Sequence, residues 1–323
     1  MHKYIGIVVV IIALVIGVMA GKHMGSSKEY SDSRGDQVSE KGEVKEKTQP
    51  YTQEIAPGVY SFSADGEYHS MFAVTDEGVA VFETVNSKHA AALLEAVKSV
   101  TDKPVLYAFQ SHNHWDHAGG GKVFQDAGAQ TVMHSLAAEW LAANPGMDTS
   151  PPDMVWDGSR KDITLGGLTI EMHYLGLNHG LGMTVFVIPE HEVAYIGDLV
   201  TPNRVMFSIV PDFNIGEWER SLTEILELNF EVAVCSHNAL PADEVPFGCT
   251  KDHVAEEKQY IVDLRNAIIA EFQKGTADVV GAIELPQYSH WEHYDDWLEM
   301  NAYRVMLDLW MGPYPWVPES SGT

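Results

Sequence analysis

The sequence predicts an α+β protein built as a four-layer αββα sandwich, in which helices cover both outer faces of two stacked β-sheets. Short apolar runs bounded by turn residues occur in two groups, before and after a proline-rich loop at residues 144–153. Segments with helical spacing of apolar residues accompany each group, and the chain becomes more helical towards its C-terminus. A hydrophobic content of 45% is enough for a substantial core, so a disordered chain is excluded.

The sequence pattern changes at Tyr51, and the first group of predicted strands follows. Turn residues at 65–66 and 76–78 separate its apolar runs. Ser87 is a suitable cap for a helix that continues to about Val100. We expect strands at residues 58–63, 70–75, 78–84, 105–109 and 130–134, and helices at residues 87–100 and 135–142.

The second group of predicted strands is followed by longer helical segments. Thr250 is a suitable N-cap, and Gly275 a suitable stop, for a helix between them. We expect strands at residues 162–165, 168–175, 183–188, 192–196 and 231–236, and helices beginning near Glu217, after Thr250 and near residue 290. We therefore assign residues 51–250 to the core and residues 251–323 to a C-terminal helical extension.

The N-terminus carries an uncharged apolar run at residues 4–20, which follows Lys3 and ends in a small-x-Ala sequence. These features predict that residues 1–20 are a cleaved signal peptide or, because the run is nearly long enough to span a bilayer, a membrane anchor. A buried helix of a cytosolic protein is the remaining alternative. Residues 21–50 are polar and predict a flexible linker. We therefore expect an exported protein, either periplasmic or tethered to the membrane and facing outward.

The chain is strongly acidic, with a formal net charge of −26. Residues 21–50 are neutral, and residues 51–323, with 13 basic and 40 acidic residues, carry a net charge of −27. Such a surface repels nucleic acid and anionic lipid head groups, so we expect a small-molecule substrate as the partner. Contact with a membrane is expected only through residues 4–20, if that segment is retained. The two cysteines, Cys235 and Cys249, exclude a disulfide-framed scaffold. They either form one bond or remain two buried thiols.

The stretch "SHNHWDH" places His112, His114, Asp116 and His117 directly after a predicted buried strand. Alternate side chains of an extended chain point to the same side, so His112 and His114 can approach one cation. The turn that follows lets Asp116 and His117 face a second cation. Nitrogen-rich donors with a single carboxylate suit zinc best among the common metals.

Further ligands are expected at later strand ends, where three positions fit. His179 lies in "LNHG" between two strands, Asp198 follows "VAYIG", and His237 follows "VAVCS". A lone histidine at a strand end is more often structural, as we expect for His69, His134 and His173. The ordered occurrence of all these signals favours a metal centre.

These four motifs, "SHNHWDH", "LNHG", "YIGD" and "CSHN", make residues 51–250 resemble the metallo-β-lactamase superfamily. The resemblance implies the αββα sandwich of that family and two zinc ions. The implied ligands of the first ion are His112, His114 and His179, those of the second are Asp116, His117 and His237, and Asp198 bridges both. Asp116 is also expected to orient the nucleophile and to move its proton.

Details of the pattern narrow the expected activity. His114 stands where the di-iron branch of the family has glutamate, which favours zinc hydrolysis. Asp198 resembles the bridging carboxylate of the thioesterase, lactonase and sulfatase branches. We therefore expect a metal-dependent enzyme that uses a metal-bound hydroxide to hydrolyse a small ester, lactone or related substrate. The alternatives are β-lactamase activity, an iron-dependent sulfur dioxygenase-like enzyme, and an accessory metal-binding protein of a periplasmic oxidation pathway.

One aromatic segment, "YSHWEHYDDW" at residues 288–297, lies outside the part that resembles the family. It predicts either a wall over the metal centre or a contact that docks the C-terminal helix onto the core.

Overall fold

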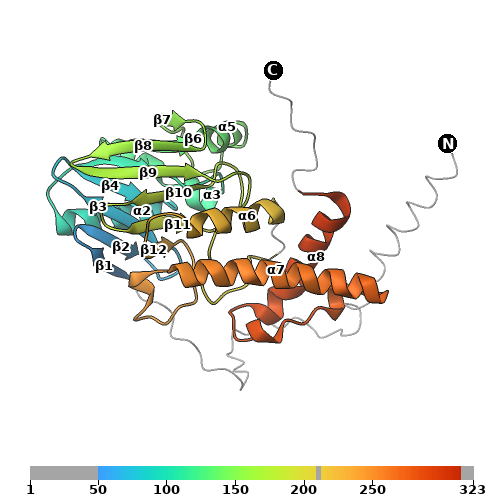
Figure 1. Cartoon of the computed structure of the whole chain (residues 1–323). Helices are drawn as coiled ribbons and strands as arrows, with labels where there is room; N and C mark the ends of the chain where they lie inside the picture. Colours follow the sequence, from blue (N-terminus) through green and yellow to red (C-terminus); the bar gives the residue numbers. More distant parts are fainter. Residues whose placement is uncertain (1–49, 209–211, 314–323) are drawn as a thin grey trace, which may run out of the picture. The chain divides into compact units, whose positions relative to one another are not determined.

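The structure of the protein is a computed structural model, and it describes residues 50–208 and 212–313 (Figure 1). The predicted signal peptide or anchor at residues 1–20 lies outside the described residues, as does the predicted linker except for Pro50. Within the described ranges, no helix combines the length and the apolar composition that a membrane span needs.

The first sheet contains seven strands that follow one another in sequence order, β1-β2-β3-β4-β5-β6-β7. Its first four strands pair antiparallel, and β4 to β7 pair parallel. The strands are β1 Tyr51–Ala56, β2 Val59–Ser63, β3 Ser70–Val74, β4 Val79–Phe82, β5 Val105–Phe109, β6 Gln130–His134 and β7 Met154–Trp156. Parallel neighbours need a crossover, and helix α2 (Ser87–Val100) provides the one between β4 and β5.

The second sheet contains five strands in the order β12-β11-β10-β9-β8. The strands are β8 Arg160–Leu165, β9 Leu168–Tyr174, β10 Thr184–Ile188, β11 Val193–Gly197 and β12 Val232–Cys235. All neighbours pair antiparallel except β11 and β12, which are parallel. Helix α6 (Ile215–Leu226) forms the crossover between them.

Burial alternates along the central strands of the second sheet and defines the layers. On β10, Phe186 and Ile188 join the core between the two sheets, whereas Val185 and Val187 face the helices on the other side. Those helices are α6, α7 (Lys251–Lys274) and α8 (Tyr294–Met311) (Figure 1). Helices α2 and α4 (Gly121–Asp126) cover the outer face of the first sheet. The predicted four-layer αββα sandwich with C-terminal helices is therefore confirmed.

The C-terminal helices share a core with the second sheet. Tyr260 and Leu264 of α7 and Val305 of α8 are buried in one cluster with strand residues such as Val187 and Ile196. Helix α7 has Thr250 as its N-cap and Gly275, at φ +74°, as its C-cap, as the sequence predicts. Helix α8 begins at Tyr294 instead of near residue 290.

Two edge strands and two short helices were not predicted. Strand β1 is largely exposed and polar, and β7 is apolar but has only three residues after the proline-rich loop, so neither shows an apolar run long enough to predict a strand. Helices α3 (Trp115–Ala118) and α4 are too short to show helical spacing. The N-cap of α2 is Asn86, whose side chain accepts a hydrogen bond from the His89 amide at 3.0 Å, and Ser87 is the first helical residue.

Candidate metal centre

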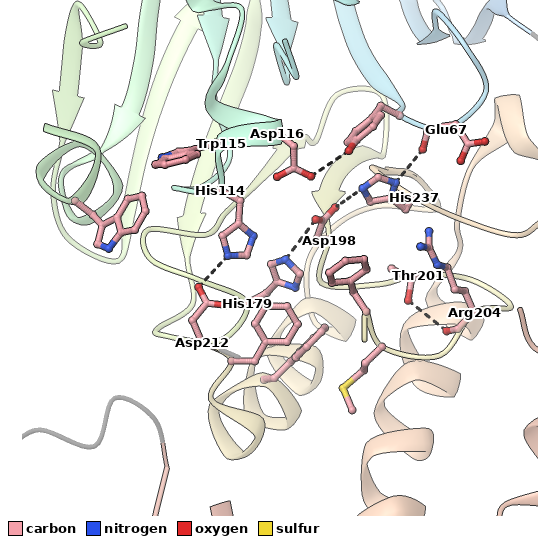
Figure 2. A pocket seen from close by; sticks show the side chains of 16 residues that line it. Glu67, His114, Trp115, Asp116, His179, Asp198, Thr201, Arg204, Asp212 and His237 are labelled. Carbon is pink, nitrogen blue, oxygen red and sulfur yellow. Dashed lines mark hydrogen bonds and ion pairs between the residues drawn. The ribbon is translucent and has the colours of Figure 1, made fainter. Parts of the chain in front are cut away.

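The predicted ligands come together beyond the carboxyl ends of strands from both sheets. His112, His114, Asp116 and His117 follow β5, with His114 immediately before α3 and the last two within it. His179 lies in the connection between β9 and β10. Asp198 is the first residue after β11, and His237 comes two residues after β12. Figure 2 shows several of these side chains around one pocket.

Asp198 lies at the centre of this cluster, and its side chain is 7% exposed. Its Oδ2 atom is 3.0 Å from Nε2 of His117, 3.3 Å from Nε2 of His179 and 4.0 Å from Nε2 of His112. Its Oδ1 atom is 4.0 Å from Nε2 of His237. Four imidazole nitrogens from three separate segments therefore converge on one buried carboxylate.

Among the described residues, the cluster contains three overlapping groups of atoms that could each hold a metal ion, because the atoms of each group lie within 4.8 Å of one another. These groups are His112, His114, His179 and Asp198; Asp116, His117 and His237; and Glu83, His112 and His117. The first two groups together contain the seven predicted ligands, with Asp198 in the first group only. Which ions bind, and through which atoms, remains a prediction.

The donor atoms fit a cation. Nε2 of His112 and Oδ1 of Asp198 are buried and have no hydrogen-bond partner among the described residues. Nδ1 of His112 lies 2.8 Å from the Ser111 hydroxyl, so its Nε2 is the nitrogen left for a metal. A buried polar atom without a partner is costly, and a bound cation would satisfy both atoms.

The electrostatic environment of Asp198 and His112 favours the protonation states that bind metals. Burial alone would raise the pKa of Asp198, but the neighbouring charges of His117 and His237 hold that pKa well below its usual range. Burial lowers the pKa of His112 well below the ordinary value for histidine. The carboxylate is therefore ionised and the His112 imidazole neutral at pH 7, as metal ligation requires. At His117 burial would lower the pKa, but Asp198 and Glu83 outweigh it and raise that pKa well above the ordinary value, so a bound metal would have to displace a proton there.

Glu83, which sequence reasoning missed, supports the cluster from behind. It follows β4, is fully buried, and accepts a hydrogen bond from the Ser111 hydroxyl. Its Oε2 atom lies 3.5 Å from Nδ1 of His117, so Nε2 of that ring points to Asp198. The available signal was an acidic residue at the end of an apolar strand, the same signal that identified Asp198.

Asp212 is a second missed residue. Its Oδ2 atom lies 2.9 Å from Nε2 of His114, which leaves Nδ1 of His114 for a metal (Figure 2). Burial would raise the pKa of Asp212, but the hydrogen bond and charge of His114 outweigh it and lower that pKa. Asp212 lies outside the predicted strands, so no sequence signal placed it next to His114.

Tyr68 is the third missed residue, and it comes from the β2–β3 connection. Its hydroxyl donates a hydrogen bond to Oδ2 of Asp116 at 3.1 Å, and its ring centroid lies 4.6 Å from that of His237. Burial and the charge of Asp116 raise the pKa of Tyr68, so the phenol remains a donor at neutral pH. The sequence showed only a turn at residues 65–66, not the direction of the side chain that follows it.

A cavity of about 610 Å³ opens in front of the cluster (Figure 2). His114, Asp116, His179, Asp198 and His237 contribute to its lining. Much of the remaining lining is aromatic: Tyr68, Trp115, Trp140, Phe207, Phe213 and Trp218. A small organic molecule with an apolar or aromatic part fits such a pocket.

Comparison with known families and proteins agrees with this geometry. The model of the metallo-beta-lactamase superfamily matches residues 64–237, just over half of the chain. The chain is 30% identical over 175 residues to the alpha subunit of 2,4-dinitroanisole O-demethylase from Nocardioides sp. (strain JS1661), a match that covers 54% of this chain and 53% of that protein. It is 26% identical over 159 residues to the metallo-beta-lactamase IND-1 of Chryseobacterium indologenes, with 49% of this chain and 65% of that protein covered. The matches thus span about half to two thirds of these relatives.

Solved structures share the fold. A metallo-beta-lactamase from Pontibacter korlensis aligns with a TM-score of 0.57 at 20% identity, over 66% of this chain and 99% of that one. The sec-alkylsulfatase Pisa1 from Pseudomonas sp. aligns with a TM-score of 0.65 at 15% identity, over 81% of this chain and 50% of that one. At sequence identities as low as 15–20%, these alignments establish a shared fold and no more.

Proposed function

Because the chain belongs to the metallo-beta-lactamase superfamily, whose members are mostly hydrolytic enzymes, we propose that it is an exported zinc-dependent hydrolase of a small ester, lactone or related substrate. The observation that carries this proposal is the convergence of four imidazoles on the buried carboxylate of Asp198. A carboxylate that lies between two groups of ligands could act as a ligand in both groups. The proposed metal is zinc, in two ions, because imidazole nitrogens outnumber carboxylate oxygens among the donors.

The proposed roles follow the placement of the side chains. When bound, the metal ions supply Lewis acidity and bring the pKa of a bound water close to neutrality. Asp116, whose side chain is 56% exposed, lies at the pocket surface, where its carboxylate can orient a water molecule and accept a proton from it. Tyr68 fixes that carboxylate through its hydroxyl. Glu83 and Asp212 hold His117 and His114 in the orientations that ligation needs.

Metal analysis of protein purified without added metal, followed by assays with aryl esters, lactones, sulfate esters and penicillins, tests the proposal. We expect about two zinc ions per chain and hydrolysis of an ester or a lactone. A single iron without hydrolysis would instead favour the dioxygenase-like alternative. Full zinc occupancy without any turnover would favour an accessory metal-binding protein.

Matched histidine variants test the ligand assignment. We expect His114→Ala to lose metal and activity together. His69 is an unsuitable control, because its amide donates to the carbonyl of Ser236, next to the proposed ligand His237. His173, whose Nε2 lies 2.9 Å from Glu171 on β9, is outside the pocket lining and serves instead. Equal metal contents of His114→Ala and His173→Ala would contradict the assignment.

Export is proposed from residues 1–20 and supported by the bond between Cys235 and Cys249, because disulfides persist mainly in oxidising compartments. Fractionation of the native host should place the protein outside the cytosol. Its N-terminus should be Gly21, or the apolar segment should still be attached. Cytosolic protein with an intact Met1 would contradict export without affecting the hydrolase proposal.

A further inference from the structure

Within the part of the chain that the structure describes, one side chain with a permanent positive charge lines the pocket. Among the described residues that line it, Arg204 is the one arginine or lysine, whereas Glu67, Asp116, Asp198 and Asp212 are acidic. In Figure 2, Arg204 and Trp115 lie at opposite edges of the pocket, with Asp198 between them. A neutral ester would need no cation there, so the charge of Arg204 calls for another explanation.

The guanidinium of Arg204 is held in place but not neutralised. Its Cζ atom lies 4.9 Å from the ring centroid of Trp297, and its side chain is 17% exposed. Its carboxylate neighbour within the described residues is Glu292, 3.9 Å from Nε and 46% exposed. A pair at that distance, with one partner nearly half exposed, is weak. In residues 50–208 and 212–313, no side chain accepts a hydrogen bond from this guanidinium, so its donors are available to a ligand.

The backbone that carries Arg204 is fixed by the aromatic segment at residues 288–297. The amide of Glu292 donates to the carbonyl of Asn203 at 2.8 Å, and the amide of Val205 donates to the carbonyl of Glu292 at 3.3 Å. Within the loop, the Thr201 hydroxyl donates to the carbonyl of Arg204 at 3.3 Å. The segment therefore contributes to the pocket by positioning a cation at its edge.

We infer that Arg204 binds an anionic oxygen group of the substrate, either a carboxylate or a sulfate. Trp297 is then a positioning residue that holds the guanidinium towards the pocket. The inference rests on the proposed hydrolase function. Arginine recognises such groups through paired hydrogen bonds, and stacking on an aromatic ring fixes its plane. The acidic chain repels anions at long range, so the short-range contact with Arg204 would select among the anionic molecules that enter.

Length-matched esters test the inference. The zinc-loaded enzyme is assayed with 4-nitrophenyl hexanoate, with the 4-nitrophenyl half-ester of adipic acid, and with 4-nitrophenyl sulfate. We expect Arg204→Met to reduce the ratio of kcat/KM for an anionic substrate to that for the hexanoate by about tenfold or more, the effect of one charge-assisted hydrogen bond. An effect on the half-ester indicates that Arg204 binds a carboxylate distant from the ester bond. An effect on the sulfate alone indicates that Arg204 binds the reacting group itself. Arg160→Met removes the same charge from β8, outside the pocket lining, and should leave the ratios unchanged.

Trp297→Leu should lower the same ratio by about threefold, and Arg204→Lys by an amount between the effects of Trp297→Leu and Arg204→Met. Each of these two variants keeps a cation at residue 204 but loses part of what orients it towards the substrate. Thermal unfolding of each variant shows whether the fold is intact. Unchanged ratios in Arg204→Met, or an equal loss for all three substrates in a folded variant, would overturn the inference.

A binding measurement separates this inference from the proposed function. Calorimetric titration of the zinc-loaded protein with adipate and with hexanoate compares a second carboxylate with a methyl group at the same chain length. We expect adipate to bind at least about fivefold more tightly to the wild type, and this preference to disappear in Arg204→Met. Should the wild type hydrolyse no ester, the hydrolase proposal fails, and a preference for adipate that depends on Arg204 would still support an anion site. Ester hydrolysis without any preference for adipate would leave the hydrolase proposal standing and reject the anion site.

Discussion

At the scale of single residues, Asp198 is the side chain on which the candidate centre depends. Its carboxylate is within 4.0 Å of four imidazoles, and burial leaves it with little solvent to stabilise the negative charge. Asp198→Asn keeps the size of the side chain but removes the charge. We expect this variant to lose most bound metal and to reduce kcat/KM by about a hundredfold or more.

Metal content by mass spectrometry and kcat/KM on an aryl ester check the Asp198→Asn prediction. Asp162→Asn is the matched control, because Asp162 pairs with Arg160 on the exposed part of β8. Wild-type metal content in Asp198→Asn would remove Asp198 from the ligand set.

Tyr68 offers a second test at this scale. Tyr68→Phe removes the hydrogen bond to Asp116 and keeps the ring that packs against His237. We expect kcat to fall by about tenfold, within the range for loss of a hydrogen bond to a charged group, while metal content and the unfolding temperature stay near those of the wild type. Tyr60→Phe on β2, where the ring stacks on Phe72, is the control. Equal kcat values for the two variants would show that the Tyr68 hydroxyl has no part in turnover.

The residues that the sequence predicted and those that it missed differ in a physical way. His112, His114 and His117 lie in one short segment, so local spacing identified them. Glu83 and Asp212 contact the cluster only because distant segments fold next to it. Glu83 lies 3.5 Å from His117, and Asp212 is hydrogen-bonded to His114 at 2.9 Å. Glu83 follows an apolar strand, as Asp198 does, but a single carboxylate in a sequence has no spacing that would indicate which histidine it contacts.

At the scale of elements, helix α7 places a buried acid under the loop that carries Arg204. Glu257 accepts hydrogen bonds from the amide and the hydroxyl of Thr201, both at 3.3 Å. Burial raises the pKa of Glu257 to about 8, against the lowering effect of those hydrogen bonds. Because the folded state binds this proton more tightly than the unfolded state, the free energy of unfolding should fall as pH rises from about 4.5 to about 8.

Glu257→Gln should therefore be less sensitive to pH than the wild type. We expect it to gain stability relative to the wild type across that window, on the order of a few kcal/mol at pH 8, because glutamine has no charge to bury. Urea unfolding at several pH values measures the difference. Glu256→Gln, at the adjacent exposed position of α7, corrects for loss of a surface charge. Parallel stability curves for Glu257→Gln and the wild type would contradict the raised pKa.

The bond between Cys235 and Cys249 connects the end of β12 to the residue before the N-cap of α7. It closes a loop with a sequence separation of 14 residues and lies two residues before His237. We expect the Cys235→Ala/Cys249→Ala double variant to lose about 3 kcal/mol of stability and to bind the second metal more weakly. A reductant should lower the unfolding temperature of the wild type but not of the double variant. If the reductant affects both equally, the bond does not contribute.

The elements also show where sequence patterns stop being informative. Buried central strands such as β5 and β10 were predicted nearly to the residue, because every side chain of an apolar run finds a place in a core. Strand β1 at the edge of the first sheet was missed, because its residues are mostly polar and exposed and show no apolar pattern. It forms a strand because its backbone pairs with β2.

At the scale of the whole molecule, the chemistry of the leaving group decides between an esterase and a β-lactamase. Opening a β-lactam leaves an amide nitrogen that must be protonated or otherwise stabilised. The phenol of Tyr68, which lines the pocket, has a raised pKa and is therefore a poor proton donor. An aryl ester releases a phenolate that needs no proton at neutral pH. The alkoxide that a lactone releases would be stabilised by a metal ion in the second group of ligands, Asp116, His117 and His237.

We therefore predict that kcat/KM for aryl esters or simple lactones exceeds that for penicillins and carbapenems by at least about tenfold, or roughly 1.4 kcal/mol in transition-state binding. The net charge of −26 adds to this difference, because it gives anionic antibiotics no long-range attraction to the protein. Arg204 supplies one local contact for a carboxylate, so penicillins should bind as weak competitive inhibitors of ester hydrolysis, and less so in Arg204→Met. A side-by-side panel on one zinc-loaded preparation measures both effects. A β-lactam as the best substrate would contradict this prediction. It would show that the pocket contains a proton donor other than Tyr68 for the amide nitrogen.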